Sequence, residues 1–209
     1  MKLTLLCVTQ AKNYVWPFLR HMETVADQLH AQLVIAGDGD DAIQTLIEGS
    51  VAGRFVGVRS RGYLESVLDA ALEQCDGEYV LRLDDDERCS PAMVTWLESD
   101  AYLIGTHWKF PRMHLWPDTQ HYIVEPQLWP DEQTRLSVRE KAGGRRTIHA
   151  GSPFGGGALA PVAIEHHKFL VRTRAEREDT ARRWHNGNMI AFSLPEDVFV
   201  NPRLEDVPC

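Results

Sequence analysis

The sequence predicts an α/β protein built on a mainly parallel sheet with flanking helices, and three observations support this. Short apolar runs alternate with amphipathic stretches through the first half of the chain, which is the pattern of consecutive βα units. The 209 residues suffice for one buried core and are too few for two full domains. The composition, 44% hydrophobic and 25% charged, is that of a globular chain.

Short runs rich in apolar, β-branched and aromatic residues predict the strands. Four of them lie in the first half, where the helical stretches between them favour parallel pairing, and one lies in the second half. The expected strands are Leu3–Val8, Leu33–Ala36, Phe55–Val58, Tyr79–Leu83 and Thr106–Phe110.

Apolar residues at helical spacing predict the helices that join these strands. Pro17 suits the first turn of the helix between the first two strands. The helix before the fourth strand is expected to end at Gly77, because glycine readily adopts the left-handed cap conformation. After that strand, Ser90 and Pro91 suit the N-cap and first position of a helix through Leu97.

The second half is rich in Trp, His, Pro and Gly, and it predicts an irregular substrate-binding region rather than a second core. Near its end, Thr173 and Glu176 form a capping-box pattern that opens a helix through about His185. The tail from Asn186 carries turn signals and is expected to pack back over the domain.

Charge and hydropathy exclude some classes of protein. With 30 acidic and 22 basic residues and a formal charge of −8, the chain lacks a general electrostatic grip on nucleic acid or anionic membrane. No apolar stretch is long enough for a signal region or a membrane span, so we expect a soluble, cytoplasmic protein. The four cysteines are widely spaced and are expected to be free thiols: Cys7, Cys75, Cys89 and Cys209.

An acidic cluster marks the end of the fourth strand, where Leu83 is followed directly by Asp84, Asp85, Asp86 and Glu87. In open α/β sheets, ligands bind at the carboxyl ends of the strands. Adjacent carboxylates repel one another unless a cation or a proton intervenes, and Mg²⁺ or Mn²⁺ would do this while keeping positions open for phosphate oxygens. The pattern therefore indicates a metal site, with a solvated acidic turn as the alternative.

The stretch Gly62–Leu97 resembles the central segment of family-2 glycosyltransferases with the Rossmann-like GT-A fold. In that family a helix precedes a Gly-Glu-Tyr-hydrophobic strand that ends in an Asp-x-Asp motif. Later segments resemble further family elements in the same order: Trp108–Arg112, Trp129–Leu136, His149 and the pair His166-His167. The resemblance implies one domain over 1–209, with a nucleotide-sugar-binding half (1–100), an acceptor and catalytic half (101–185) and a tail (186–209).

The resemblance also implies a function. We expect an inverting, metal-dependent hexosyltransferase that uses Mn²⁺ or Mg²⁺ to move a sugar from a nucleotide sugar, UDP-type by expectation, to a hydroxyl acceptor. Asp86 matches the direct metal ligand, and His166 matches the histidine that completes the metal shell, with His167 as its rival. The residues implied to bind the donor are Thr9, Gln10, Asp38, Arg61, Gly62, Asp84 and Asp85.

An inverting transfer needs a base on the acceptor side to take the hydroxyl proton. The resemblance points to Asp131, with Glu132 as the nearby rival and Glu125 as the more distant one. Cationic groups such as Arg135, together with the metal, would stabilise the leaving diphosphate.

Other functions stay open at this point. A nucleotidyltransferase shares the need for metal carboxylates, although Thr9–Lys12 is a poor version of its phosphate-binding signature. A non-catalytic nucleotide-sugar-binding module is a second alternative. The acceptor is a glycan, a small molecule or a modified DNA base, the last suggested by a basic run in the second half: Arg139, Lys141, Arg145 and Arg146.

Overall fold

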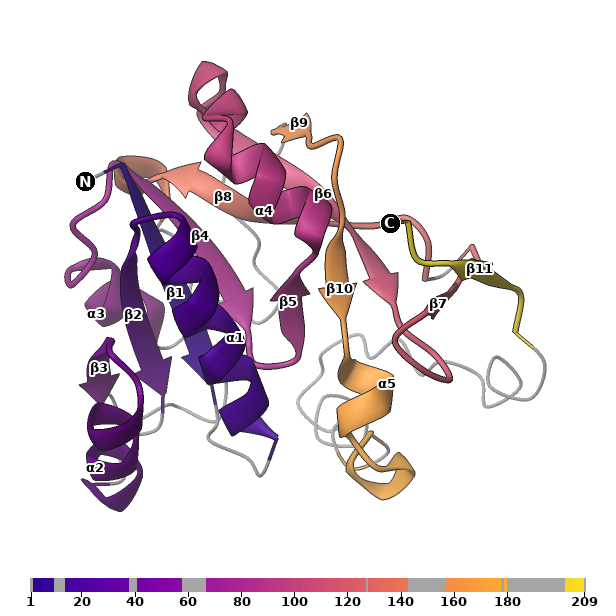
Figure 1. The fold of residues 1–209 in the computed structure, drawn as a ribbon, viewed down its shortest axis with the longest axis horizontal. Helices are drawn as coiled ribbons and strands as arrows, with labels where there is room; N and C mark the ends of the chain where they lie inside the picture. The colour runs from indigo at the N-terminus through magenta and orange to yellow at the C-terminus, as the bar shows by residue number, and fades with distance from the viewer. Residues whose placement is uncertain are drawn as a thin grey trace.

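The core of the fold is one sheet. The acidic cluster follows a strand near the middle of that sheet and lies at the carboxyl end of the strand. A computed structural model describes residues 2–9, 14–37, 41–57, 67–126, 128–142, 157–177, 179 and 202–208. Within them nine strands form the sheet in the order β3-β2-β1-β4-β8-β6-β10-β5, with β9 paired to β6 (Figure 1). Five of its eight strand pairings are parallel, which confirms the predicted mainly parallel α/β fold.

The first half contributes the parallel strands that the sequence predicted. They are β1 (Leu3–Thr9), β2 (Gln32–Gly37), β3 (Arg54–Gly57) and β4 (Tyr79–Asp84). All seven residues of β1 are buried, as expected of a central strand with covered faces. The cores on the two faces are distinct: one side of the sheet packs against α1 and α4, and the other packs against α3.

The second half holds more regular structure than the sequence predicted. Its strand β6 (His107–His114) corresponds to the predicted Thr106–Phe110, whereas β8 (Asp131–Val138), β9 (Ala158–Leu159) and β10 (Ile164–His166) were not predicted. In the first half, the short β5 (Glu87–Cys89) was not predicted either. The polar start of β8, Asp-Glu-Gln-Thr-Arg, gives no strand periodicity, because several of these side chains bind partners at the site described below. A separate ribbon pairs β7 (His121–Ile123) with β11 (Leu204–Asp206), so this part of the tail packs on the domain as expected.

The helices are α1 (Val15–Gln28), α2 (Asp41–Ser50), α3 (Leu68–Leu72), α4 (Pro91–Glu98) and α5 (Lys168–Val171), with short 3₁₀ turns at Ala101–Ile104 and Arg139–Lys141. The sequence did not predict α2 or α5. Pro17 lies in the first turn of α1, as expected. No helix in the described ranges is long and apolar enough to cross a membrane.

Local capping signals correspond closely to the structure. The Met93 N–H donates to the Ser90 hydroxyl at 3.2 Å, which confirms the predicted N-cap of α4. Thr173 and Glu176 bond reciprocally, side chain to backbone, as a capping box requires. The helix that follows was predicted to run to about His185. The structure describes this segment only up to residue 177 and at residue 179, so the rest of the predicted helix lies outside the described residues.

Gly77 has a different role from the one predicted. The preceding helix, α3, ends at Leu72, well before the glycine. A Cβ on Gly77 would lie 2.6 Å from the Thr4 backbone nitrogen and 2.7 Å from the Leu3 carbonyl carbon. The glycine is therefore required by its close approach to β1, not by a helix cap.

The thiol prediction is confirmed where it can be checked. Cys7, Cys75 and Cys89 are free and buried, and Cys209 lies outside the described residues. Burial raises the pKa of the Cys75 thiol to about 11 and that of the Cys89 thiol to about 12, so both are protonated and unreactive near neutral pH.

Candidate active site

The acidic cluster lies at the carboxyl end of β4, where the sequence placed it. Asp84 is the last residue of β4 and is in register with Val8 on β1, while Glu87 opens β5. Between them the chain turns through Asp85 and Asp86. The Thr9 hydroxyl donates to Asp85 Oδ2 at 3.0 Å. Thr9 and the acids, which lie far apart in sequence, thus meet at one edge of the sheet.

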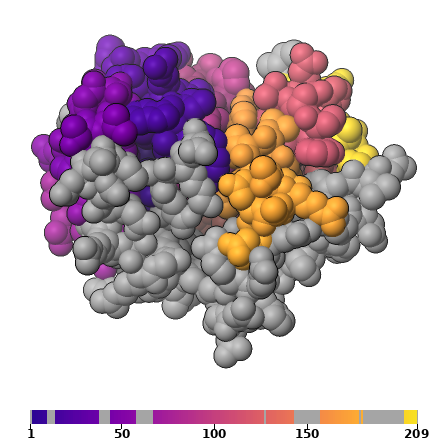
Figure 2. Space-filling model, turned by 90° about the horizontal axis from the view of Figure 1, so that it is seen from below, coloured from indigo at the N-terminus to yellow at the C-terminus, as the bar shows by residue number. Residues whose placement is uncertain are grey.

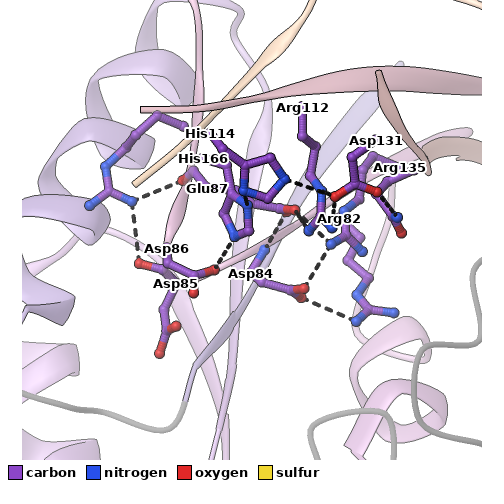
Figure 3. Close-up of polar contacts among 12 residues, drawn as sticks. Arg82, Asp84, Asp85, Asp86, Glu87, Arg112, His114, Asp131, Arg135 and His166 are labelled. Carbon is purple, nitrogen blue, oxygen red and sulfur yellow. Dashed lines mark hydrogen bonds and ion pairs between the residues drawn. The ribbon is translucent and has the colours of Figure 1, made fainter. Parts of the chain in front are cut away.

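One half of the cluster is neutralised by arginines. Arg135 on β8 donates to Asp84 Oδ2 and to Glu87 Oε1, both at 2.7 Å, and its side chain is only 5% exposed. Arg82 donates to Asp84 Oδ1 at 3.1 Å, and Arg112 to Glu87 Oε1 at 3.0 Å (Figure 3). Burial alone would raise the pKa of Asp84, but Arg135 and Arg82 outweigh it and lower the pKa to about 2. Asp84 is therefore ionised, and arginines bind the side chains of both acids.

The other half of the cluster faces α5 and β10. The Asp86 carboxylate lies with Oδ1 3.4 Å from Nε2 of His166 and with Oδ2 2.6 Å from the guanidinium of Arg172. The same guanidinium is 3.8 Å from Asp85 Oδ1 and stands 5.8 Å over the Tyr14 ring. Seen from below, the orange α5 segment lies beside the indigo N-terminal elements, as these contacts require (Figure 2).

The two adjacent histidines differ in what they present to Asp86. His166 turns its ring toward the carboxylate and is buried. His167 donates its backbone N–H to the Asp86 carbonyl at 2.7 Å, and its ring Nε2 faces Glu165 at 3.2 Å. Of the two rings, that of His166 lies beside the Asp86 carboxylate and that of His167 lies beside Glu165.

A second carboxylate site adjoins the first. Asp131, the first residue of β8, receives Arg112 Nε at 2.9 Å, His114 Nε2 at 3.0 Å and the Gln133 side-chain amide at 2.8 Å. Burial alone would raise the pKa of Asp131. The hydrogen bond from His114 and the charge of Arg112 outweigh burial and lower the pKa to well below the usual range. Asp131 is therefore an ionised carboxylate with hydrogen bonds on both oxygens.

His114 links this carboxylate to His166. The two rings come from paired positions on the parallel strands β6 and β10, and their Nδ1 atoms are 3.0 Å apart. Burial lowers the pKa of both imidazoles, and for His166 the charge of Arg112 lowers it further while Asp86 opposes the shift. A continuous polar chain therefore runs from Asp131 through His114 and His166 to Asp86 (Figure 3).

The remaining predicted residues lie elsewhere. Glu132 is 3.5 Å from Lys109 through its Oε2 and is 37% exposed, while Glu125 receives the Arg203 backbone N–H at 3.1 Å. Four of the predicted donor-binding residues lie outside the described ranges: Gln10, Asp38, Arg61 and Gly62.

The residues of this site that sequence reasoning missed include Arg82, Arg112, His114 and Arg172. His114 and His166 become neighbours only through the register of β6 on β10, which no local pattern encodes. Arg112 faces Asp131 for the same reason, across the register of β6 on β8. Arg172 follows α5, a helix too short to leave a periodic signal.

The mostly parallel sheet with flanking helices matches the fold of GT-A-like nucleotide-binding proteins. No family model matches the chain, and no curated protein matches it. Among solved structures, the mannosyltransferase PcManGT from Pyrobaculum calidifontis, in complex with GDP-Man and Mn²⁺, aligns with a TM-score of 0.58 at 15% identity, over 87% of this chain and 60% of that one.

Two further structures share the fold. S. aureus TarS 1-349 aligns with a TM-score of 0.54 at 11% identity, over 94% of this chain and 68% of that one. The bifunctional IspDF from Campylobacter jejuni aligns with a TM-score of 0.50 at 11% identity, over 86% of this chain and 53% of that one. The chain therefore spans about half to two thirds of the length of these three proteins, and at such identities the likeness shows the fold alone.

Proposed function

We propose that the chain is a metal-dependent glycosyltransferase of inverting type, which moves a sugar from a nucleotide sugar, UDP-type by preference, to a hydroxyl acceptor. The observation that carries the proposal is the pairing of Asp86 with His166 at the ligand-binding edge of a GT-A-type sheet. The family resemblance of Gly62–Leu97 supports the same activity.

The chemistry of Asp86 and His166 fits a divalent cation. Two ligands at about 2.1 Å from one ion and at right angles lie about 3 Å apart, close to the 3.4 Å between Asp86 Oδ1 and His166 Nε2. Among the described residues no group of three or more His, Cys, Asp or Glu side chains could hold a metal, so further ligands would come from water and the donor diphosphate. Mn²⁺ or Mg²⁺ bound there would act as a Lewis acid toward the departing diphosphate.

The other residues at this edge prepare the site for the donor. Arg82 and Arg135 bind the ionised Asp84 side chain at the start of the turn. These bonds hold in place the backbone that bears Asp85 and Asp86. We propose that Asp84, Asp85 and Thr9 line the donor, together with Gln10, Asp38, Arg61 and Gly62. Neutral His166 offers a lone pair, which an imidazolium could not.

The base that takes the acceptor proton is proposed to be Asp131, with Glu132 and Glu125 as rivals. Asp131 is the one of the three that belongs to the polar chain ending at Asp86. Its hydrogen bonds also favour a second role, in positioning, and the two roles predict different behaviour for Asp131→Asn.

A donor panel tests the function directly. The purified chain is incubated with UDP-, GDP- and other nucleotide sugars, with and without Mn²⁺, and release of the nucleoside diphosphate is measured. We expect Mn²⁺-dependent hydrolysis of at least one donor, absent from Asp86→Ala. If no donor is hydrolysed and none binds, the proposed function is wrong.

A nucleotidyltransferase is the second candidate, favoured by the shared fold of IspDF. It would use the same metal edge with a nucleoside triphosphate and a phosphorylated partner. Pyrophosphate release from a triphosphate panel, with no release of diphosphate from nucleotide sugars, would select this activity over the first.

A further inference from the structure

His114, whose ring contacts the ring of His166, is a residue of the site to which no role has yet been assigned. Both rings are buried, each only 4% exposed as a residue, and their centroids are 4.5 Å apart. The inner contact joins Nδ1 to Nδ1 at 3.0 Å, and each outer nitrogen faces a carboxylate, Asp131 on one side and Asp86 on the other. These three contacts restrict which ring nitrogens of His114 and His166 can carry a hydrogen.

Proton counting starts at Asp131. Its carboxylate is ionised and can only accept, so the hydrogen in the 3.0 Å contact belongs to Nε2 of His114. A neutral imidazole carries one N–H, which leaves Nδ1 of His114 as an acceptor. The 3.0 Å contact between the two Nδ1 atoms then requires the hydrogen on Nδ1 of His166.

The consequence falls on the outer nitrogen of His166. With its hydrogen on Nδ1, neutral His166 directs a lone pair from Nε2 toward Asp86 Oδ1, which is also an acceptor. Two acceptors 3.4 Å apart are a favourable arrangement only when a cation lies between them. Either a third proton or a metal ion satisfies this condition, and the metal is the one that the proposed function supplies.

We propose that His114, held by Asp131, is a positioning residue that fixes His166 in the Nδ1–H tautomer and so presents Nε2, beside Asp86, as a ligand for a divalent cation. The inference rests on the proposed function for the metal. His114 acts through its neighbour and touches neither substrate nor ion. Arg112 and Gln133 complete the arrangement by holding the Asp131 carboxylate in place.

Outer partners of this kind orient a ligating imidazole, and their loss typically weakens metal binding by about 10- to 100-fold. Two variants of the full chain separate orientation from packing. His114→Leu fills similar space without polar atoms, whereas His114→Gln supplies an amide donor for Asp131 and a carbonyl acceptor for Nδ1 of His166. We expect His114→Leu to lose about 10- to 100-fold in Mn²⁺ affinity and His114→Gln to recover most of it.

The matched control is His121→Ala. The His121 side chain is also bonded to a carboxylate, with Nδ1 2.8 Å from Asp118, but it is 37% exposed and belongs to the β7–β11 ribbon rather than to the chain of contacts from Asp131 to Asp86. Its removal should leave Mn²⁺ affinity unchanged. Mn²⁺ binding is measured by electron paramagnetic resonance on each variant, and folding is checked by thermal melting.

A spectroscopic measurement covers the case in which His114→Leu fails to fold. In the wild-type chain labelled with ¹⁵N-histidine and loaded with Mg²⁺, the resonances of His166 should show a hydrogen on Nδ1 and none on Nε2. The opposite tautomer would overturn the inference whatever the variants do.

The outcomes separate this inference from the function beneath it. Wild-type Mn²⁺ affinity in His114→Leu, with binding lost in Asp86→Ala, would overturn the positioning role and leave the metal-dependent function standing. Wild-type protein that binds no Mn²⁺, even with a nucleotide sugar present, would overturn both.

Discussion

The four consecutive acids at the end of β4 form two pairs whose charges are compensated differently: the outer pair, Asp84 and Glu87, and the inner pair, Asp85 and Asp86. Asp84 and Glu87 are bonded by arginines from β4, β6 and β8, so their charge is compensated by rigid strands of the sheet. Asp85 and Asp86 face the Thr9 hydroxyl, the neutral His166 imidazole and the Arg172 guanidinium that follows a short helix, and Lys168 on that helix is a further positive charge near Asp86. We call the arginine-bound outer pair the foundation, and we propose that the inner pair is a receptive site for a further cation.

The comparison predicts its largest effect at Asp86. Because Asp86→Ala removes a ligand while leaving the arginine-bound pair intact, Mn²⁺-dependent donor binding and turnover should be abolished. Calorimetry with UDP and Mn²⁺ measures this, and Asp118→Ala, an exposed acid on the β7 side, is the control. Unchanged Mn²⁺-dependent UDP affinity in Asp86→Ala would exclude the metal assignment.

Disrupting the foundation, the arginine-bound pair Asp84 and Glu87, should lower the stability of the fold. Arg135→Met keeps the length of the side chain but leaves Asp84 and Glu87 without their shared donor, and breaking a buried pair in this way costs about 3–5 kcal/mol of stability. The control is Lys2→Met, which breaks an ion pair with side chains 60% and 43% exposed and should cost at most about 1 kcal/mol.

Urea unfolding of both variants measures the difference in the free energy of unfolding. Equal losses in Arg135→Met and Lys2→Met would mean that the buried arginine is not a foundation. In that case the contrast between the two pairs of acids would need another explanation.

How much of this contrast the sequence contains depends on the range of each interaction. The strand leading into Asp84 and the Ser90 cap are local patterns, and they were predicted correctly. Most partners of the acids come from β6, β8 and β10, which are brought near β4 by the strand order and register of the sheet, and Arg172 comes from the segment after α5. The polar start of β8 conceals a strand, because Asp131 and Arg135 lie there to serve the site.

The third prediction concerns Asp131, for which base and positioning roles give different results. As a base, Asp131→Asn should keep Mn²⁺ affinity and lose roughly a hundredfold or more in turnover. As the anchor of His114, it should lose metal affinity and turnover together, because an amide can turn its NH₂ toward the imidazole and reverse the tautomer. Mn²⁺ affinity and turnover on one variant decide between them, and wild-type values for both would transfer the base role to Glu132 or Glu125.

The stability of the fold at acid pH should depend on the ionisation of Asp84, one of the two arginine-bound acids. The pKa of Asp84 is lowered to about 2 in the fold, so its contribution is complete above its unfolded value near 3.8 and is lost as pH falls toward 2. The shift corresponds to about 2 kcal/mol. Thermal melting of wild type and Asp84→Asn between pH 5 and 2 measures this, and we expect a shallower acid dependence in the variant.

The smallest effect is expected at Arg172, the guanidinium that shares Asp86 with the proposed ion. Its 2.6 Å contact compensates Oδ2, the oxygen that does not face His166, so an incoming cation meets a carboxylate whose charge is already partly offset. Arg172→Gln removes that charge but keeps a donor, and Mn²⁺ affinity in the absence of donor should therefore rise a few-fold. The measurement is the same Mn²⁺ titration, and Arg177→Gln, further along the same segment, is the control. A fall in affinity would instead mean that Arg172 fixes Asp86 in place, so that both pairs of acids are held by arginine in the same way and the distinction between foundation and receptive site is wrong.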